Sequence, residues 1–232
     1  MIELLQFTPA LGLMNASPFC MKVEVFLRLA GLEYRGVDTA LPMRAPKGKL
    51  PVLRDDGLLV ADSQDIIEHL QRRRAERLPP SLLEVPNGAQ HALRRMLEEH
   101  TYFAMLWLRW IDAAGWSTTA PAFFGTLPWP LRALVPPLVR RKMRRDLIGQ
   151  GTGRHSHGEI CARACADFDA AAALLGEQPF FAGDAPGTVD ATVYAFVANA
   201  LWPPIDNPVR VHLQQSPRLV AYCERMRERV GQ

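Results

Sequence analysis

The sequence predicts two domains, an α/β domain followed by an all-α domain. In the first third of the chain, short apolar runs flank one helical stretch and then lead into a hairpin and a second helix. After Asp62, helical spacing of apolar residues takes over, and no further alternating run with a hairpin turn occurs. A stretch rich in Arg and Pro, 72–88, separates the two patterns. We therefore place the domains at 1–78 and 89–232.

Local signals predict the elements of the first domain. The expected strands are 2–7, 33–37, 50–55 and 58–61, and the expected helices are 18–31 and 62–74. A loop is expected at 41–48. A strand–helix–strand unit implies parallel pairing through a right-handed crossover. Asp56-Gly57 is a hairpin signal, so the next two strands should be antiparallel. Pro51 stands at the opening of a strand, where proline is tolerated, and is a candidate for a cis peptide bond.

The stretch Ser17-Pro18-Phe19-Cys20 stands at the predicted start of the first helix. Pro18 suits the first helical turn, and Ser17 suits the N-cap position before it. A thiol or hydroxyl here lies against the positive end of the helix dipole and against free backbone N–H groups. That environment lowers the pKa of a thiol and favours an anion. The alternative is that Ser17 is only a cap and Cys20 only a small buried residue.

Composition argues against several classes of protein. The 232 residues are 48% hydrophobic and 22% charged, as in ordinary soluble globular proteins, and the net charge of +3 is too small to argue for a nucleic-acid partner. We recognise no signal peptide and no apolar run long enough for a membrane span. The four cysteines are too few and too scattered for a disulfide framework, so a reducing cytoplasm is expected.

Three motifs, taken in order, resemble a known family. They are Ser17-Pro18-Phe19-Cys20 after the first strand, the run 48–53 (Gly-Lys-Leu-Pro-Val-Leu), and Asp62-Ser63 opening a helix. Together they resemble the thioredoxin-like N-terminal domain of the cytosolic glutathione transferases. The runs 44–51 and 151–156 are similar to the metaxin and failed-axon-connections branch of that superfamily, in its bacterial form. The resemblance covers nearly the whole chain and implies the glutathione transferase fold.

The resemblance implies a catalytic role for Ser17 or Cys20. Ser17 falls where the catalytic Ser or Cys of the serine- and cysteine-type transferases lies, and its hydroxyl would stabilise the glutathione thiolate. Cys20 falls at the second position of the related C-x-x-C redox motif. The first cysteine is missing here, so disulfide chemistry with two thiols is not supported.

The resemblance also implies a glutathione site. Its residues would be Lys47, Lys49, Leu50, Pro51, Asp62 and Ser63. The backbone of Leu50, before Pro51, would meet the cysteinyl part of glutathione. Ser63 and the helix N-terminus suit the γ-glutamyl carboxylate, while Asp62 suits the ammonium group. Lys47 or Lys49 would meet the glycyl carboxylate. Each position also has a plain structural explanation, as a helix start, a fold-required proline or a loop lysine.

An aromatic stripe stands in the first long helical stretch, 90–110. Its members are Tyr102, Phe103, Trp107 and Trp110, with Trp116 beyond them. Such a stripe suits core packing, or else an apolar wall that faces the first domain, where the family has its electrophile pocket. The stretch 121–137 is rich in Pro and aromatic residues, and we expect a loop with short helical pieces there, a lid or a partner surface.

Two further motifs have structural interpretations. Histidines at 155 and 157 with Cys161 and Cys165 invite a metal site, but the spacing matches no metal motif, so no metal is expected. Ser156 and Glu159 instead predict a capping box that opens a helix to about 175. Asp190 follows a glycine at a helix cap, and its carboxylate is expected to satisfy free backbone N–H groups.

These observations predict a cytoplasmic glutathione transferase, in which the glutathione thiolate attacks a small hydrophobic electrophile. The family implies a homodimer. A second hypothesis is a non-catalytic binding or scaffold module on the same fold, as in the metaxin-like relatives. A third is a thiol reductase that uses Cys20 alone, which requires an exposed Cys20 with a depressed pKa.

Overall fold

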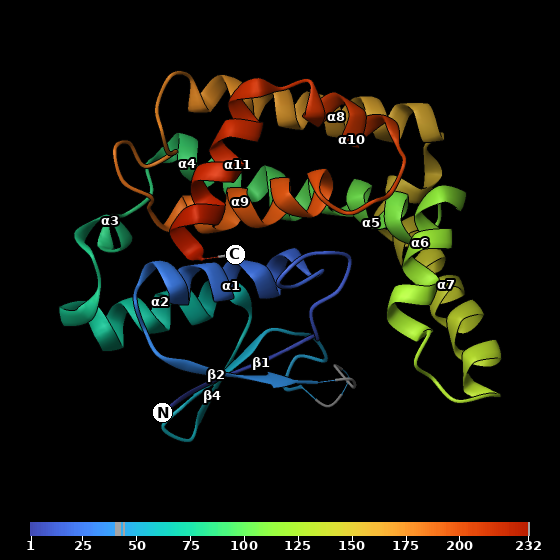
Figure 1. The fold of residues 1–232 in the computed structure, drawn as a ribbon, viewed down its shortest axis with the longest axis horizontal. Helices are drawn as coiled ribbons and strands as arrows, with labels where there is room; N and C mark the ends of the chain where they lie inside the picture. The colour runs from blue at the N-terminus through green and yellow to red at the C-terminus, as the bar shows by residue number, and fades with distance from the viewer. Residues whose placement is uncertain (40–42, 44, 232) are drawn as a thin grey trace.

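The structure of the protein, a computed structural model, describes residues 1–39, 43 and 45–231. A small sheet lies at one end and a larger group of helices at the other, with α1 (Pro18–Leu29) and α2 (Ser63–Arg74) between them (Figure 1). Positions 41, 42 and 44 of the predicted loop lie outside the described residues. The predicted architecture, an α/β part followed by an all-α part, is confirmed.

The sheet has four strands in the order β2-β1-β3-β4. They are β1 (Ile2–Gln6), β2 (Tyr34–Asp38), β3 (Val52–Asp55) and β4 (Leu58–Ala61). As predicted, β1 and β2 are parallel, with Ile2 opposite Tyr34, whereas β3 is antiparallel to β1 and β4. The β3–β4 turn has Asp56 at φ 50° and Gly57 at φ 89°. A tight two-residue hairpin needs this left-handed backbone at both positions, which explains the Asp-Gly pair.

The helical part follows a short linker with η2 (Ala75–Arg77) and α3 (Pro80–Leu83). Its helices are α4 (Gly88–Met96), α5 (Tyr102–Trp110), α6 (Ala113–Phe124), α7 (Leu131–Gln150), α8 (His157–Leu175), α9 (Thr188–Leu201), α10 (Pro208–Gln214) and α11 (Pro217–Val230). A π-helical turn, η3 (Leu97–Thr101), joins α4 to α5, and a short η4 (Thr152–Arg154) precedes α8. Within the described ranges, no helix has the length and apolar character needed to span a membrane.

The prolines of the stretch 121–137 correct one prediction. As expected, no single helix covers this stretch, because α6 and α7 are separate helices. Pro121, Pro136 and Pro137, however, lie inside those helices and not in a loop. All three line a cavity of about 450 Å³ that Trp116 also borders. Pro136 is buried, whereas Pro121 and Pro137 are exposed, so burial explains the position of only one of the three prolines inside these helices.

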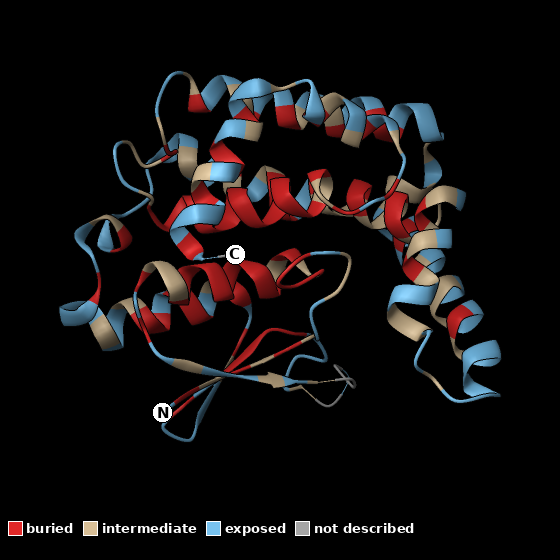
Figure 2. Cartoon of the chain, viewed as in Figure 1, coloured by how far each residue is buried: buried red, intermediate tan, exposed pale blue. Residues whose placement is uncertain are grey.

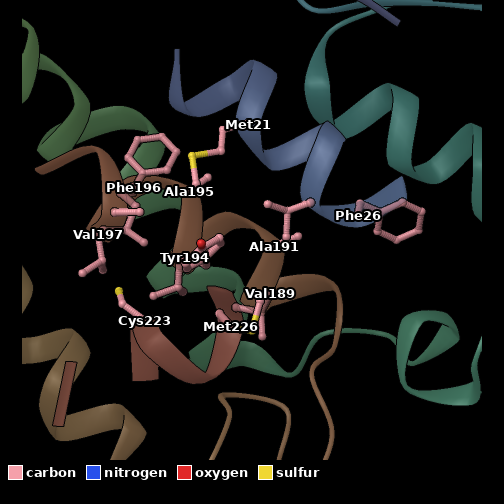
Figure 3. Packing of buried hydrophobic residues seen from close by; sticks show 14 of the residues in the cluster. Met21, Phe26, Val189, Ala191, Tyr194, Ala195, Phe196, Val197, Cys223 and Met226 are labelled. Atoms are coloured by element: carbon pink, nitrogen blue, oxygen red, sulfur yellow. The ribbon is translucent and has the colours of Figure 1, made fainter. Parts of the chain in front are cut away.

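The core is organised around α9, which packs directly against α1. Every residue of α9 except Ala200 is buried, and both helices stand out as buried segments in Figure 2. Side chains of three helices meet in this core, as Figure 3 shows: Met21 and Phe26 from α1, Val189, Tyr194 and Phe196 from α9, and Cys223 and Met226 from α11. The first helix is thus covered by the sheet on one side and by α9 on the other.

Asp190 closes the N-terminal end of α9, as predicted. Its carboxylate accepts hydrogen bonds from the backbone N–H groups of Phe181 at 2.8 Å, Gly187 at 2.9 Å and Ala182 at 3.2 Å. A Cβ on Gly187 would lie 2.6 Å from the Cβ of Ala182, so a larger cap residue does not fit. Asp190 therefore supplies the acceptor that a Ser or Thr cap would otherwise provide.

Replacing Asp190 by Ala should lower the free energy of unfolding by about 3 kcal/mol, because three N–H groups lose their acceptor in the interior. Urea denaturation followed by circular dichroism measures this change. Asp184→Ala, at an exposed position of the same loop, is the matched control and should stay within about 0.5 kcal/mol of the parent. Equal stability of the two variants would contradict the capping role.

Candidate functional site

Ser17 is the N-cap residue of α1, as the sequence predicts. Its backbone is extended, with φ −91° and ψ 117°, and its Oγ accepts a long hydrogen bond of 3.4 Å from the N–H of Cys20. The side chain is half-buried. A hydroxyl at this position lies against the positive end of the helix dipole and retains its own proton as a donor. The geometry suits stabilisation of an anion that binds at the N-terminus of the helix.

Asn15 holds the loop before Ser17 and was not predicted from the sequence. Its side chain is fully buried, donates to the carbonyl of Phe7 at 2.7 Å and accepts from the N–H of Ser17 at 3.0 Å. An Asn side chain that bonds two residues ahead in this way mimics a backbone turn. An Asn two positions before a helix cap could have indicated this turn, but many surface turns contain an Asn at the same position.

The thiol of Cys20 contradicts the predicted effect of the helix start on its pKa. Cys20 is fully buried and packs with Leu50, Val52 and Ala61. Burial raises its pKa to about 12, and the hydrogen bond from Ser17 offsets only part of that effect. Desolvation of the charged form outweighs the helix dipole here. The thiol reductase hypothesis requires an exposed Cys20 with a depressed pKa, so it loses its basis.

Leu50 and Pro51 lie beside the start of α1. The Leu50–Pro51 peptide bond is cis, as proposed from the sequence, and both residues are buried ahead of β3. Leu50 belongs to the same small apolar cluster as Cys20. The chain therefore brings the backbone before the cis proline next to the turn that carries Ser17.

Asp62 and Ser63 open α2, as predicted. Asp62 is the N-cap, and its Oδ1 accepts from the N–H of Gln64 at 2.9 Å. Its φ of 94° is unusual for a residue with a side chain, and such strain concentrates at functional sites. Asp62 is exposed, whereas Ser63 is buried at the helix start. An exposed carboxylate beside free helix N–H groups offers contacts to an ammonium and to a carboxylate at once.

The two candidate lysines differ in their surroundings. The ammonium group of Lys47 pairs with the carboxylate of Asp65 in α2 at 2.9 Å, and both side chains are exposed. This pair raises the pKa of Lys47. Lys49 is exposed on the same loop. Lys47 is therefore already oriented toward the start of α2, on the side of Asp62.

The aromatic stripe divides between three surroundings. Tyr102 meets Phe19 of α1 with ring centroids 4.9 Å apart and contacts Phe103 at 5.2 Å. Trp107 stacks on His157 of α8. Trp110 belongs to a separate aromatic cluster with Trp116, Phe123 and Phe124 of α6. The ring of Tyr102 thus reaches α1 at Phe19, two residues after Ser17.

The described residues contain no group of three or more His, Cys, Asp or Glu side chains arranged to hold a metal ion. His155 contacts Arg163, and His157 stacks on Trp107. Ser156 and Glu159 form the predicted capping box at the start of α8. The cavity of about 450 Å³ lies between α6 and α7, away from the start of α1.

Comparison with known families and proteins gives consistent matches. The glutathione S-transferase N-terminal domain matches residues 18–115, and the glutathione S-transferase C-terminal domain matches residues 164–226. The chain is 33% identical to the isoprene-epoxide–glutathione S-transferase of Rhodococcus sp. (strain AD45), over 98% of both chains.

Relatives of a second kind also match. The chain is 28% identical to Failed axon connections of Drosophila melanogaster, over 98% of this chain and 57% of that protein. It is 28% identical to Metaxin-1 of Mus musculus, over 96% of this chain and 73% of that protein. Among solved structures, the beta-etherase LigF of Sphingobium sp. strain SYK-6 has the same fold, with a TM-score of 0.68 at 18% identity over 97% of this chain and 94% of that one.

The burial of Cys20 predicts a slow reaction with thiol reagents. At pH 8 its thiol is neutral, because its pKa is about 12, so iodoacetamide should label Cys20 far more slowly than the partly exposed Cys165. Mass spectrometry of labelled peptides measures both rates, and the urea-unfolded protein serves as the control in which the two should react alike. Faster labelling of Cys20 in the folded protein would contradict its burial.

Proposed function

Because the chain belongs to the glutathione S-transferase family, we propose that it transfers the thiolate of glutathione to a small hydrophobic electrophile, with Ser17 as the group that stabilises the thiolate. The observation that carries the proposal is the half-buried Ser17 hydroxyl at the N-terminus of α1. The side chain of Asn15 holds the backbone of Ser17 in place by accepting from its N–H. The relative that acts on an isoprene epoxide and aligns along the whole chain supports an epoxide as the electrophile.

The chemistry is a nucleophilic displacement. Glutathione loses its thiol proton to solvent, and the O–H of Ser17 donates a hydrogen bond to the resulting thiolate. The positive end of the α1 dipole stabilises the same anion. The sulfur then attacks an epoxide carbon, a C–S bond forms and the C–O bond breaks. The alkoxide takes a proton from water, and the product is a hydroxyalkyl thioether.

The proposed glutathione site follows the surface from α1 to α2. The backbone of Leu50, which belongs to the same apolar cluster as Cys20 at the start of α1, would hold the cysteinyl part. Asp62 would accept from the γ-glutamyl ammonium, and Ser63 with the start of α2 would donate to the γ-glutamyl carboxylate. The glycyl carboxylate would take the place of Asp65 on Lys47 or use the exposed Lys49.

The proposed electrophile pocket begins at Tyr102. Its contact with Phe19 joins the helical part to the first turn of α1 and supports an apolar wall beside Ser17. Phe103 contacts Tyr102 and would extend this wall. Trp107 and Trp110 complete the pocket in our proposal by fixing α5 against α8 and α6.

We extend the proposal to the assembly and its compartment. The domains are 1–78 and 89–232, as the sequence pattern suggests. Family membership supports a homodimer. The four cysteines are free thiols, which supports a reducing compartment such as the cytoplasm, where glutathione is available.

A second candidate function is a non-catalytic binding module on this fold. The similarity to Failed axon connections and Metaxin-1 favours it, because those relatives match over nearly the whole of this chain. Titration calorimetry with reduced glutathione separates the two functions. A dissociation constant in or below the low millimolar range supports the transferase. No detectable heat and no shift of melting temperature would favour the binding module.

Replacing Ser17 by Gly should lower the rate of conjugation at neutral pH by about 100-fold, because the thiolate loses its hydrogen-bond donor. Glycine is the chosen substitute because it is a tolerable N-cap, so the helix start stays stable. An epoxide conjugation assay measures the rate, and the exposed Ser117→Gly in α6 is a control for loss of a serine at a remote site. Unchanged conjugation in the Ser17 variant would exclude the proposed role of its hydroxyl.

A further inference from the structure

Arg109 is a buried cation whose contacts are all neutral. It is the penultimate residue of α5 and is 8% exposed. Its guanidinium donates to the carbonyl oxygen of Ala16, to the carbonyl oxygen of Asn199 at 3.0 Å and to the side-chain oxygen of Asn199 at 3.2 Å. No carboxylate of the described residues pairs with it. The positive charge is therefore met by carbonyl and amide oxygens alone, including the carbonyl of Asn199 in the last turn of α9, where the helix dipole favours a cation.

Other buried charges in the described part of the chain have charged partners or several donors. Lys22 pairs with Glu98 at 2.7 Å, Glu24 pairs with Arg28 at 3.0 Å, Asp55 pairs with Arg74, and Asp190 has three N–H donors. Taking a charge out of water is costly, and at Arg109 hydrogen bonds to carbonyl and amide oxygens offset that cost in place of a counter-charge. What distinguishes Arg109 from these charges is that one of its acceptors is the peptide carbonyl directly before Ser17.

Arg109 and Asn199 both form hydrogen bonds with the turn that precedes Ser17. Ala16, the acceptor of the guanidinium, directly precedes Ser17. The amide nitrogen of Asn199 donates to the carbonyl of Asn15 at 3.2 Å, and Asn15 in turn accepts from the N–H of Ser17. Two residues of the helical part therefore fix both peptide carbonyls before Ser17.

The charge of Arg109 acts on the start of α1. The guanidinium bonds the carbonyl of Ala16, so its charge lies beside the residue that directly precedes Ser17. Burial lowers the pKa of Arg109 to about 10, which leaves the guanidinium charged at neutral pH. Water does not screen this charge as it screens a surface charge, so its effect on a nearby anion is strong.

We propose that Arg109 is a positioning residue for the thiolate site, where it fixes the Asn15–Ser17 turn and keeps the thiol bound at Ser17 in its anionic form. The inference rests on the proposed function, since it needs glutathione to bind beside Ser17. The bound thiolate supplies the negative charge that the surroundings of the guanidinium lack. Arg109 need not touch the sulfur for this effect, because it acts through the turn and through its charge.

The test is the pH dependence of thiolate absorbance in the ultraviolet for glutathione bound to the protein, with S-methylglutathione as a blank that has no thiol. Arg109→Gln removes the charge and should raise the pKa of the bound thiol by about 1. The conjugation rate of this variant should fall about tenfold at neutral pH and recover at a pH above the raised pKa, where the thiol ionises without help. Arg109→Lys keeps the charge and should stay closer to the parent.

Arg225→Gln is the matched control, because its guanidinium also donates two hydrogen bonds to a backbone carbonyl, that of Pro179, remote from Ser17. It should leave the pKa of the bound thiol unchanged. If glutathione binds to both proteins and its thiol has the same pKa in Arg109→Gln as in the parent, the role of Arg109 is overturned while the proposed function stands. No thiolate signal in the parent would overturn the proposed function together with it.

If Arg109→Gln does not fold, the same measurements are made on Asn199→Leu. This variant leaves the charge in place and removes the amide that holds the guanidinium and the carbonyl of Asn15. It should lower the conjugation rate several-fold and should raise the pKa of the bound thiol less than a loss of charge would. An unchanged rate and an unchanged thiol pKa would overturn the positioning role.

Discussion

The packing of α1 between the sheet and α9 is the constraint on which the rest of the structure depends. Met21 and Phe26 of α1 lie in the core that α9 organises (Figure 3). On the other side of α1, Cys20 packs with Val52 of β3. A helix covered on both sides offers its end, and not its faces, to a ligand. The site at Ser17 is therefore built on a rigid element, and the loop before it needs separate support from Asn15.

The sequence predicted those parts of the fold that short-range chemistry decides. Asp56-Gly57 predicted the hairpin because only a few residue pairs accept positive φ at both positions. Ser156 and Glu159 predicted a capping box, since both partners stand three residues apart. The cap position of Ser17 and the helix start at Asp62 were predictable for the same reason. In each case the interacting groups are close along the chain, so the pattern itself contains the contact.

The rest of the site depends on contacts that no short pattern contains. The buried pair Lys22–Glu98 joins residues 76 apart, and the bond from Arg109 to Ala16 joins residues 93 apart. The pKa of Cys20 was predicted in the wrong direction because its burial depends on side chains of the sheet as well as on its helix. Helical spacing likewise could not say that Tyr102 faces α1 while Trp107 and Trp110 face other helices.

The two candidate functions make different demands on the same fold. A scaffold that binds partners through its surface needs Arg109 only for the hydrogen bonds that hold the turn before Ser17, and loss of those bonds would lower stability. A site that stabilises a thiolate would also use the charge of Arg109, because a charge kept away from water acts more strongly on an anion that binds near it. Because Arg109 bonds the carbonyl directly before Ser17, the two functions differ in what its loss changes: the stability of the turn alone in a scaffold, and that stability together with the ionisation of bound glutathione in a transferase.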